Sequence, residues 1–204
     1  MYIPDIYKNE NPEEITTFIN ENGFAVLVNQ TNSKLWATHI PLMLKKDKHG
    51  KTILEGHISK ENPQGESFKI NTNILAIFSG PHSYISSSWY DHENVPTWNY
   101  TAVHVYGRVK VLNLEESINS LKELVDKYEA NSENPVRIED LSKQTMNQAK
   151  GIIAFQIEID AIEAVKKMSQ NRDSKNYENI IIELEKTENV NDKQVAIEMK
   201  RCPR

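Results

Sequence analysis

Short apolar segments follow one another along the first half of this chain with no helical segment between them. Turns rich in Asn, Gly and Lys separate residues 24–30, 35–44, 52–59 and 74–80. Apolar runs of this length, bounded by turn residues, predict β-strands. Because a parallel pair of strands needs a long crossover connection, strands in direct succession favour an antiparallel sheet or barrel over a doubly wound parallel fold.

Two further strands are predicted from strict alternation of apolar and polar residues. Residues 152–159 alternate in this way, and so do residues 101–111, where one face carries Val103, Val105, Val109 and Val111. Alternation with a period of two places all the apolar side chains on one face of a strand. We therefore expect each of the two strands to have one apolar face and one polar face.

Helices are predicted before, within and after the strand region. Asn11 followed by Pro12 predicts a helix start, and Asn113 followed by Glu116 predicts a capping box. Two amphipathic helices are expected after Asp173. The expected fold class is therefore mainly β with peripheral helices (α+β). The expected domains are residues 1–172 and a C-terminal helical extension over 173–204.

Composition narrows the classes of function. The 204 residues carry a net charge of -5 and one cysteine, Cys202, which argues against a disulfide scaffold and a cysteine zinc site. A dedicated nucleic-acid binder usually has a basic surplus, and here only residues 45–51 and the C-terminus are locally basic. With no membrane-length apolar run and no secretion signal, a cytoplasmic protein is expected.

Metal and hydrolase sites find little support. The six histidines form no pair at the spacing that zinc enzymes use, and Ser86, Ser87 and Ser88 lie in no Gly-x-Ser-x-Gly turn. We therefore predict no metal ligand and no catalytic residue.

Residues 79–100, SGPHSYISSSWYDHENVPTWNY, concentrate aromatic and hydroxyl side chains. They suit a pocket for a flat ligand with a polar rim, and they equally suit the end of a barrel or a dimer interface. If exposed on a monomer, the aromatic residues would form an apolar patch, so we expect a homodimer interface to include them. These residues are Tyr84, Trp89, Tyr90, Trp98 and Tyr100.

Five ordered motifs carry a resemblance to a known family. They are ATHIP (37–41), EGHISKENP (55–63), SGPHSYISSSWY (79–90), VPTWNYTAVHVYG (95–107) and KMSQNR (167–172). The chain resembles the PaiB family, described as FMN-binding negative transcriptional regulators. The resemblance implies an FMN-binding split β-barrel, generally a homodimer with the flavin at or near the subunit interface.

The resemblance also implies contacts to the cofactor. Thr38, His39, Ile40 and Pro41 are expected along the isoalloxazine ring. His57, Ser59 and Asn62 are expected near the ribityl chain or the phosphate. Lys167, Ser169 and Gln170 are expected at the phosphate end or in the pocket of the partner subunit. His39 and His57 are the first candidates.

Three functions remain open at this point. The first is a flavin-binding regulator or sensor, with DNA or another regulatory protein as its partner and no membrane. The second is an FMN-dependent oxidoreductase that acts on a small molecule, with the cofactor carrying the redox chemistry. The third is a structural dimer module with a vestigial flavin site.

Overall fold

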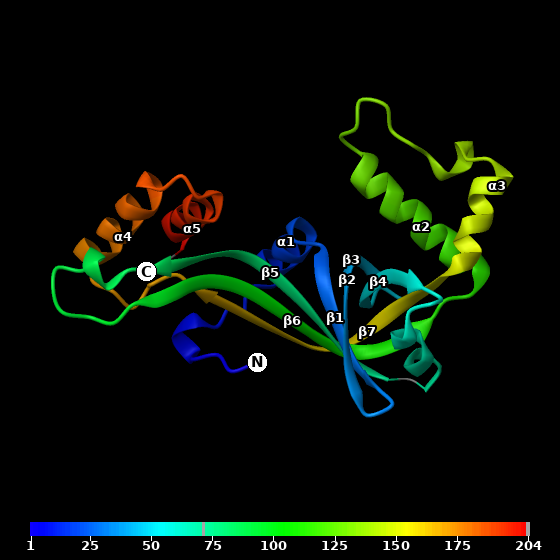
Figure 1. The fold of residues 1–204 in the computed structure, drawn as a ribbon, viewed down its shortest axis with the longest axis horizontal. Helices are drawn as coiled ribbons and strands as arrows, with labels where there is room; N and C mark the ends of the chain where they lie inside the picture. Colours follow the sequence, from blue (N-terminus) through cyan, green and yellow to red (C-terminus); the bar gives the residue numbers. More distant parts are fainter. Residues whose placement is uncertain (71, 203–204) are drawn as a thin grey trace. The chain divides into compact units, whose positions relative to one another are not determined.

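The computed structural model describes residues 1–70 and 72–202 (Figure 1). Within these residues seven strands form one antiparallel sheet in the order β2-β1-β5-β6-β7-β4-β3, which is not closed. The strands are β1 (Phe24–Thr31), β2 (Lys34–Pro41), β3 (Met43–Lys46), β4 (Thr52–Ser59), β5 (Asn73–Ile85), β6 (Thr97–Val111) and β7 (Ile152–Lys167). The predicted succession of strands is confirmed.

The α-helices lie before, between and after the strands in sequence. They are α1 (Pro12–Glu21), α2 (Leu114–Glu129), α3 (Lys143–Met146), α4 (Ser174–Lys186) and α5 (Val190–Arg201). Short 3-10 helices are η1 (Asp5–Tyr7), η2 (Pro63–Ile70), η3 (Ser87–Trp89), η4 (Ile138–Asp140) and η5 (Asn147–Gly151).

The capping box predicted at Asn113 forms, and α4 has a cap that the sequence analysis did not predict. The Asn113 side chain accepts a hydrogen bond from the Glu116 amide at 2.9 Å, and the Glu116 carboxylate accepts one from the Asn113 amide at 2.9 Å. Asp173 caps α4 by accepting from the Asn176 amide at 3.0 Å. Each cap satisfies amides that would otherwise lack a partner at a helix start.

Three strand predictions need correction. The segment 35–44 forms two strands, because the Leu42 amide leaves the ladder and donates to Gly23 O at 2.8 Å. β5 and β7 extend well beyond residues 80 and 159, to Ile85 and Lys167.

The chain divides into two compact units. Unit 1 comprises residues 1–18, 78–104 and 163–204, and unit 2 comprises residues 19–77 and 105–162. The chain passes between the units within α1, β5, β6 and β7. The predicted boundary at residue 172 divides the chain along its sequence and stays a prediction.

Each unit has its own buried residues. In unit 2, Phe68 and Phe155 pack edge to face with their centroids 4.9 Å apart. In unit 1, α4 and α5 lie side by side (Figure 1) and pack with Ile85, Tyr90 and Met168 into one apolar cluster, the C-terminal core. No helix among the described residues is long and apolar enough to cross a membrane.

Candidate functional site

Gly56 is the point where the first two sequence motifs meet. A Cβ atom at this position would lie 2.6 Å from Leu42 Cδ2 and 3.0 Å from Pro41 O. A Cβ atom here would displace the end of the Leu42 side chain and crowd the Pro41 carbonyl, so glycine lets the end of β2 lie close to β4. The structure thereby brings the segments 37–41 and 55–63 together within unit 2.

Thr38 and Asn62 belong to one hydrogen-bonded cluster. Asn62 Nδ2 donates to Thr38 Oγ1 at 2.8 Å, and Thr38 Oγ1 donates to Gln64 Oε1. Gln64 is fully buried and donates through Nε2 to Leu27 O at 3.0 Å. The cluster fastens the turn after β4 to β1 and β2. The sequence analysis did not identify Gln64 as part of this cluster. The only sequence signal for it is its position two residues after Asn62, whose side chain accepts from the Gln64 amide.

β2 divides its four candidate residues between its two faces. Ile40 is buried, and Thr38 shares its face, whereas His39 and Pro41 point to the opposite face. The His39 ring is exposed and lies 6.1 Å from the Phe24 ring, with the two planes inclined by 30°. The four side chains therefore cannot all approach one ligand from a single side of the strand.

The face that His39 shares is broad and mainly apolar. The register of β1 with β2 and β5 places His39 beside Val26, and Val26 beside Ile77. These side chains are half-buried or exposed, unlike those on the opposite face of β1. We call this surface the outer face; it comprises Phe24, Val26, Val28, Leu35, Ala37, His39, Pro41, Leu75 and Ile77.

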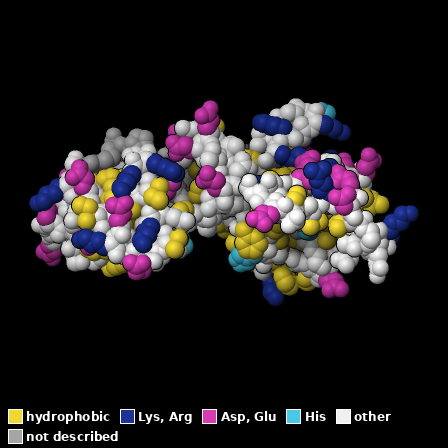
Figure 2. All heavy atoms as spheres, turned by 90° about the horizontal axis from the view of Figure 1, so that it is seen from above, with side chains coloured by type: hydrophobic (Ala, Val, Ile, Leu, Met, Phe, Trp, Pro, Cys, Tyr) yellow, Lys and Arg dark blue, Asp and Glu magenta, His cyan; other side chains and the backbone are white. Residues whose placement is uncertain are grey.

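Hydrophobic side chains reach the surface among charged ones in the view of Figure 2. On the outer face, Phe24 and Leu35 are the most exposed. A flat apolar surface of this kind suits the face of an aromatic ring.

Polar groups gather where β4 ends. His57 is half-buried, and burial lowers the pKa of its imidazole, which favours the neutral form that can both donate and accept a hydrogen bond. Ser59 and Lys60 follow on the exposed turn. The Lys60 amide donates to Gly151 O at 2.9 Å, which fixes the backbone of the turn and leaves the ammonium at the surface.

Lys60 has no acidic partner in the part of the chain that the structure describes. The sequence prediction missed Lys60, although it is the only cation in GHISKENP.

The three remaining candidates lie in unit 1, at the turn after β7. Lys167 Nζ donates to Thr97 Oγ1 at 2.5 Å, and burial lowers its pKa. Ser169 is buried in a left-handed conformation (φ 57°) and donates to Asn99 Oδ1 at 3.0 Å. Gln170 accepts from the Met168 amide at 2.7 Å and donates to Lys166 O at 2.6 Å. All three side chains thus help to shape this turn.

The aromatic segment is split between exposed and buried residues. Tyr84 and Trp98 are 47% and 52% exposed, with their rings 6.0 Å apart in an edge-to-face arrangement. His82 lies 6.2 Å from Trp98. In contrast, Tyr90 is only 8% exposed and Trp89 packs against the C-terminal core. Because α4 and α5 pack against them, Tyr90 is buried and Trp89 is half-buried, so these two side chains are less exposed than Tyr84 and Trp98. A dimer interface that includes all five aromatic residues stays a prediction.

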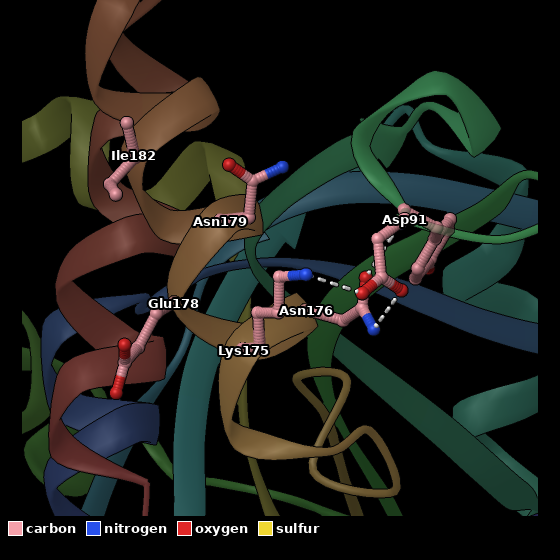
Figure 3. A pocket seen from close by; sticks show the side chains of 7 residues that line it. Asp91, Lys175, Asn176, Glu178, Asn179 and Ile182 are labelled. Carbon is pink, nitrogen blue, oxygen red and sulfur yellow. Dashed lines mark hydrogen bonds and ion pairs between the residues drawn. The ribbon is translucent and has the colours of Figure 1, made fainter.

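A cavity of about 360 Å³ lies beside this segment in unit 1 (Figure 3). Its polar residues are already joined to one another: Lys175 and Asn176 both contact Asp91. Its lining comprises Tyr90, Asp91, Lys175, Asn176, Glu178, Asn179 and Ile182. Among the described residues, no group of three His, Cys, Asp or Glu side chains is placed to hold a metal ion.

The fold, an open antiparallel sheet with peripheral helices, is shared by solved structures of other proteins. The chain is similar to the FAD and heme binding protein from Mycobacterium smegmatis, with a TM-score of 0.64 and 14% identity over 84% of this chain and 78% of that one. It is equally similar to the flavocytochrome Anf3 from Azotobacter vinelandii, with a TM-score of 0.64 and 13% identity over 87% of this chain and 78% of that one. The expected fold class is confirmed.

The particular family follows from the sequence match. Residues 1–161 match the model described as "Putative FMN-binding domain", and the chain belongs to this family. It is also 44% identical over 198 residues to "Protease synthase and sporulation protein PAI 2" of Bacillus subtilis, covering 96% of this chain and 95% of that protein. The predicted resemblance and the predicted cofactor, FMN, are confirmed.

The residues of unit 2 fit FMN chemically. The outer face offers an apolar wall for a flat ring, and the neutral His57 offers a hydrogen bond to a polar rim. A phosphate group needs donors and positive charge, which the Ser59 hydroxyl and the Lys60 ammonium provide on one turn.

Proposed function

We propose that this FMN-binding protein is a flavin-dependent negative regulator of transcription, or a sensor that reports through such a regulator. The observation that carries the proposal is the 44% identity to the Bacillus subtilis protein, whose name is "Protease synthase and sporulation protein PAI 2" and which is covered over 95% of its length. FMN would supply redox and light-absorbing chemistry, and the protein would supply binding and orientation. A cytoplasmic location is part of the proposal.

For the flavin site we propose two groups of residues. His39 and Pro41 would flank the ring on the outer face, while Thr38 and Ile40 would support β2 from the other side. His57, Ser59 and Lys60 would bind the ribityl and phosphate groups, and Asn62 would hold their turn through Thr38. Lys167, Ser169 and Gln170 are proposed as contacts to a flavin held mainly by the other protomer.

We further propose a homodimer whose interface includes Tyr84 and Trp98. Large aromatic side chains that are half exposed on a monomer are enriched at protein interfaces. They bury a large area at a small entropic cost, because they have few rotatable bonds.

Trp98→Ala is expected to weaken this dimer by about 30-fold or more, because a tryptophan hot spot contributes about 2 kcal/mol or more. Sedimentation equilibrium over a range of concentrations measures the dissociation constant. Val190→Ala is the control, since Val190 is an exposed apolar residue on α5. Equal dissociation constants for Trp98→Ala and the wild type would show that this surface is not part of the dimer interface.

An FMN-dependent oxidoreductase that acts on a small molecule is the second candidate. It is favoured by the open outer face, which would leave one side of a bound ring accessible to a substrate. A direct DNA contact would have to overcome a net charge of -5, so a regulatory protein is an alternative partner.

Anaerobic mixing of the FMN-loaded protein with NADH or NADPH separates the two functions. We expect the flavin absorbance near its visible maximum to persist, as a sensor requires. Bleaching of the flavin at turnover rates, followed by its reoxidation with a small-molecule acceptor, would favour the oxidoreductase function over the regulator function. A mobility-shift assay at several salt concentrations then tests direct DNA binding. We expect the affinity for DNA to be weak and to fall steeply as salt rises.

A further inference from the structure

We propose that the first turn of α4, through Asn176, clamps the loop between η3 and β6 and thereby positions the aromatic residues at the proposed dimer surface. The helices α4 and α5 lie beyond residues 1–161, which match the FMN-binding family, so the match gives them no role. The clamp itself rests on contacts within unit 1. Its effect on the dimer rests on the proposed function.

Asn176 is the centre of the clamp. It is 3% exposed, and its Oδ1 accepts from the Asp91 amide at 3.0 Å. Its Nδ2 donates to Asp91 Oδ1 at 2.9 Å and to Asp173 Oδ2 at 2.7 Å. Figure 3 shows the Asn176 and Lys175 side chains both directed at Asp91. An amide is required here because the position must accept from a main-chain N–H and donate to two carboxylates.

Two neighbours on α4 strengthen the contact with the loop. Lys175 Nζ donates to Asp91 Oδ2 at 2.8 Å, and Asn179 Nδ2 donates to Trp89 O at 2.6 Å. Lys175, His92 and Asn176 hold the pKa of Asp91 well below its usual range. The carboxylate therefore remains charged and available to Asn176 at neutral pH.

Packing against the C-terminal core also holds the same loop in place. Tyr90 lies in the C-terminal core, and the Arg172 guanidinium lies 4.9 Å from the centre of its ring. On α5, Asp192 accepts from Ser83 Oγ at 2.6 Å, and Met199 accepts from Asn99 Nδ2 at 3.5 Å. The helices thus contact β5, the loop and β6.

This arrangement links the clamp to the exposed aromatic residues. Ser83 and Asn99 are buried toward the helices, and their strand neighbours Tyr84 and Trp98 point to the opposite face. The clamped loop is the connection between β5, which carries Tyr84, and β6, which carries Trp98. A loop held at Asp91 therefore keeps these two rings in the edge-to-face contact.

A reversal of the amide–carboxylate pair tests the clamp. Asn176→Asp places a new carboxylate against those of Asp91 and Asp173, which should open the loop. The double variant Asn176→Asp/Asp91→Asn restores an amide opposite a carboxylate at the contact between positions 176 and 91, while the contact with Asp173 stays repulsive, so partial recovery is expected. Asn191→Asp on α5 is the control, because Asn191 is exposed.

Hydrogen–deuterium exchange of the amides at residues 89–92 is the primary measurement. We expect exchange about tenfold faster or more in Asn176→Asp, corresponding to the loss of at least one buried hydrogen bond, and partial recovery toward the wild-type rate in the double variant. Equal exchange in Asn176→Asp and the wild type, or no recovery in the double variant, overturns the clamp. If Asn176→Asp does not fold, a folded double variant supports the pairing and an unfolded one refutes it.

The dissociation constant of the dimer and the affinity for FMN, measured on the same variants, test the proposed function separately from the clamp. A dissociation constant that rises in Asn176→Asp and recovers in the double variant supports the link to the dimer surface. Changed exchange with an unchanged dissociation constant keeps the clamp and refutes that link. A wild-type protein that is monomeric at micromolar concentration refutes the proposed dimer, while the exchange result still decides the clamp.

Discussion

Lys60→Ala is expected to weaken FMN binding by about one to two orders of magnitude, because a hydrogen bond between charged groups contributes about 1.5–3 kcal/mol. The proposed site has the Lys60 ammonium beside the Ser59 hydroxyl on a turn whose backbone is fixed by Gly151. Fluorescence titration of FMN into the apoprotein measures the affinity. The loss should shrink as salt rises, since salt screens the exposed charge of the wild type.

Lys48→Ala is the matched control, because Lys48 is also an exposed lysine on a turn of unit 2. Riboflavin supplies a second control, since it lacks the phosphate and should bind both variants alike. If Lys60→Ala leaves the FMN affinity unchanged, or lowers the riboflavin affinity equally, then the phosphate does not bind at this turn.

Gly56→Ala is expected to lower the free energy of unfolding by about 1–3 kcal/mol, the usual cost of forcing extra atoms into a packed site. The added Cβ would overlap Leu42 Cδ2 and crowd Pro41 O, so the end of β2 must move away from β4. Because the two strands carry the proposed ring and phosphate contacts, FMN affinity should fall in the same variant. Denaturant unfolding and FMN titration measure the two effects.

Gly151→Ala is the control for this substitution, because a Cβ at Gly151 meets no atom within 4 Å. Its stability and FMN affinity should stay close to those of the wild type. If the Gly56→Ala protein is destabilised but binds FMN with wild-type affinity, the contact between the two motifs at Gly56 is not part of the FMN site.

Much of the architecture could be predicted from local patterns in the sequence. The capping box at Asn113 forms as expected, because a cap involves residues only a few positions apart. The strand succession predicted an antiparallel sheet for the same reason, since it depends on segment length and turn residues. The strand ends were harder to place, and β5 and β7 continue through residues whose apolar alternation is weak.

The candidate site was only partly predictable. The motifs predicted the family and FMN, but a motif does not state on which face of a strand its side chains lie. The register of β1 with β2 places His39 on the outer face and Thr38 with Gln64 on the other. The sequence prediction missed Lys60 because exposed lysines are common in turns, and only its place beside Ser59 distinguishes it.

The sequence by itself therefore determined the fold class, the helix starts and the cofactor family, because each is written in local spacing or in long ordered motifs. Only the tertiary structure decided that Tyr90 is buried and Trp89 half-buried while Tyr84 and Trp98 are exposed. The physical reason is distance along the chain. Asn176 and Asp91 are 85 residues apart, and their contact exists only once α4 has packed against the loop.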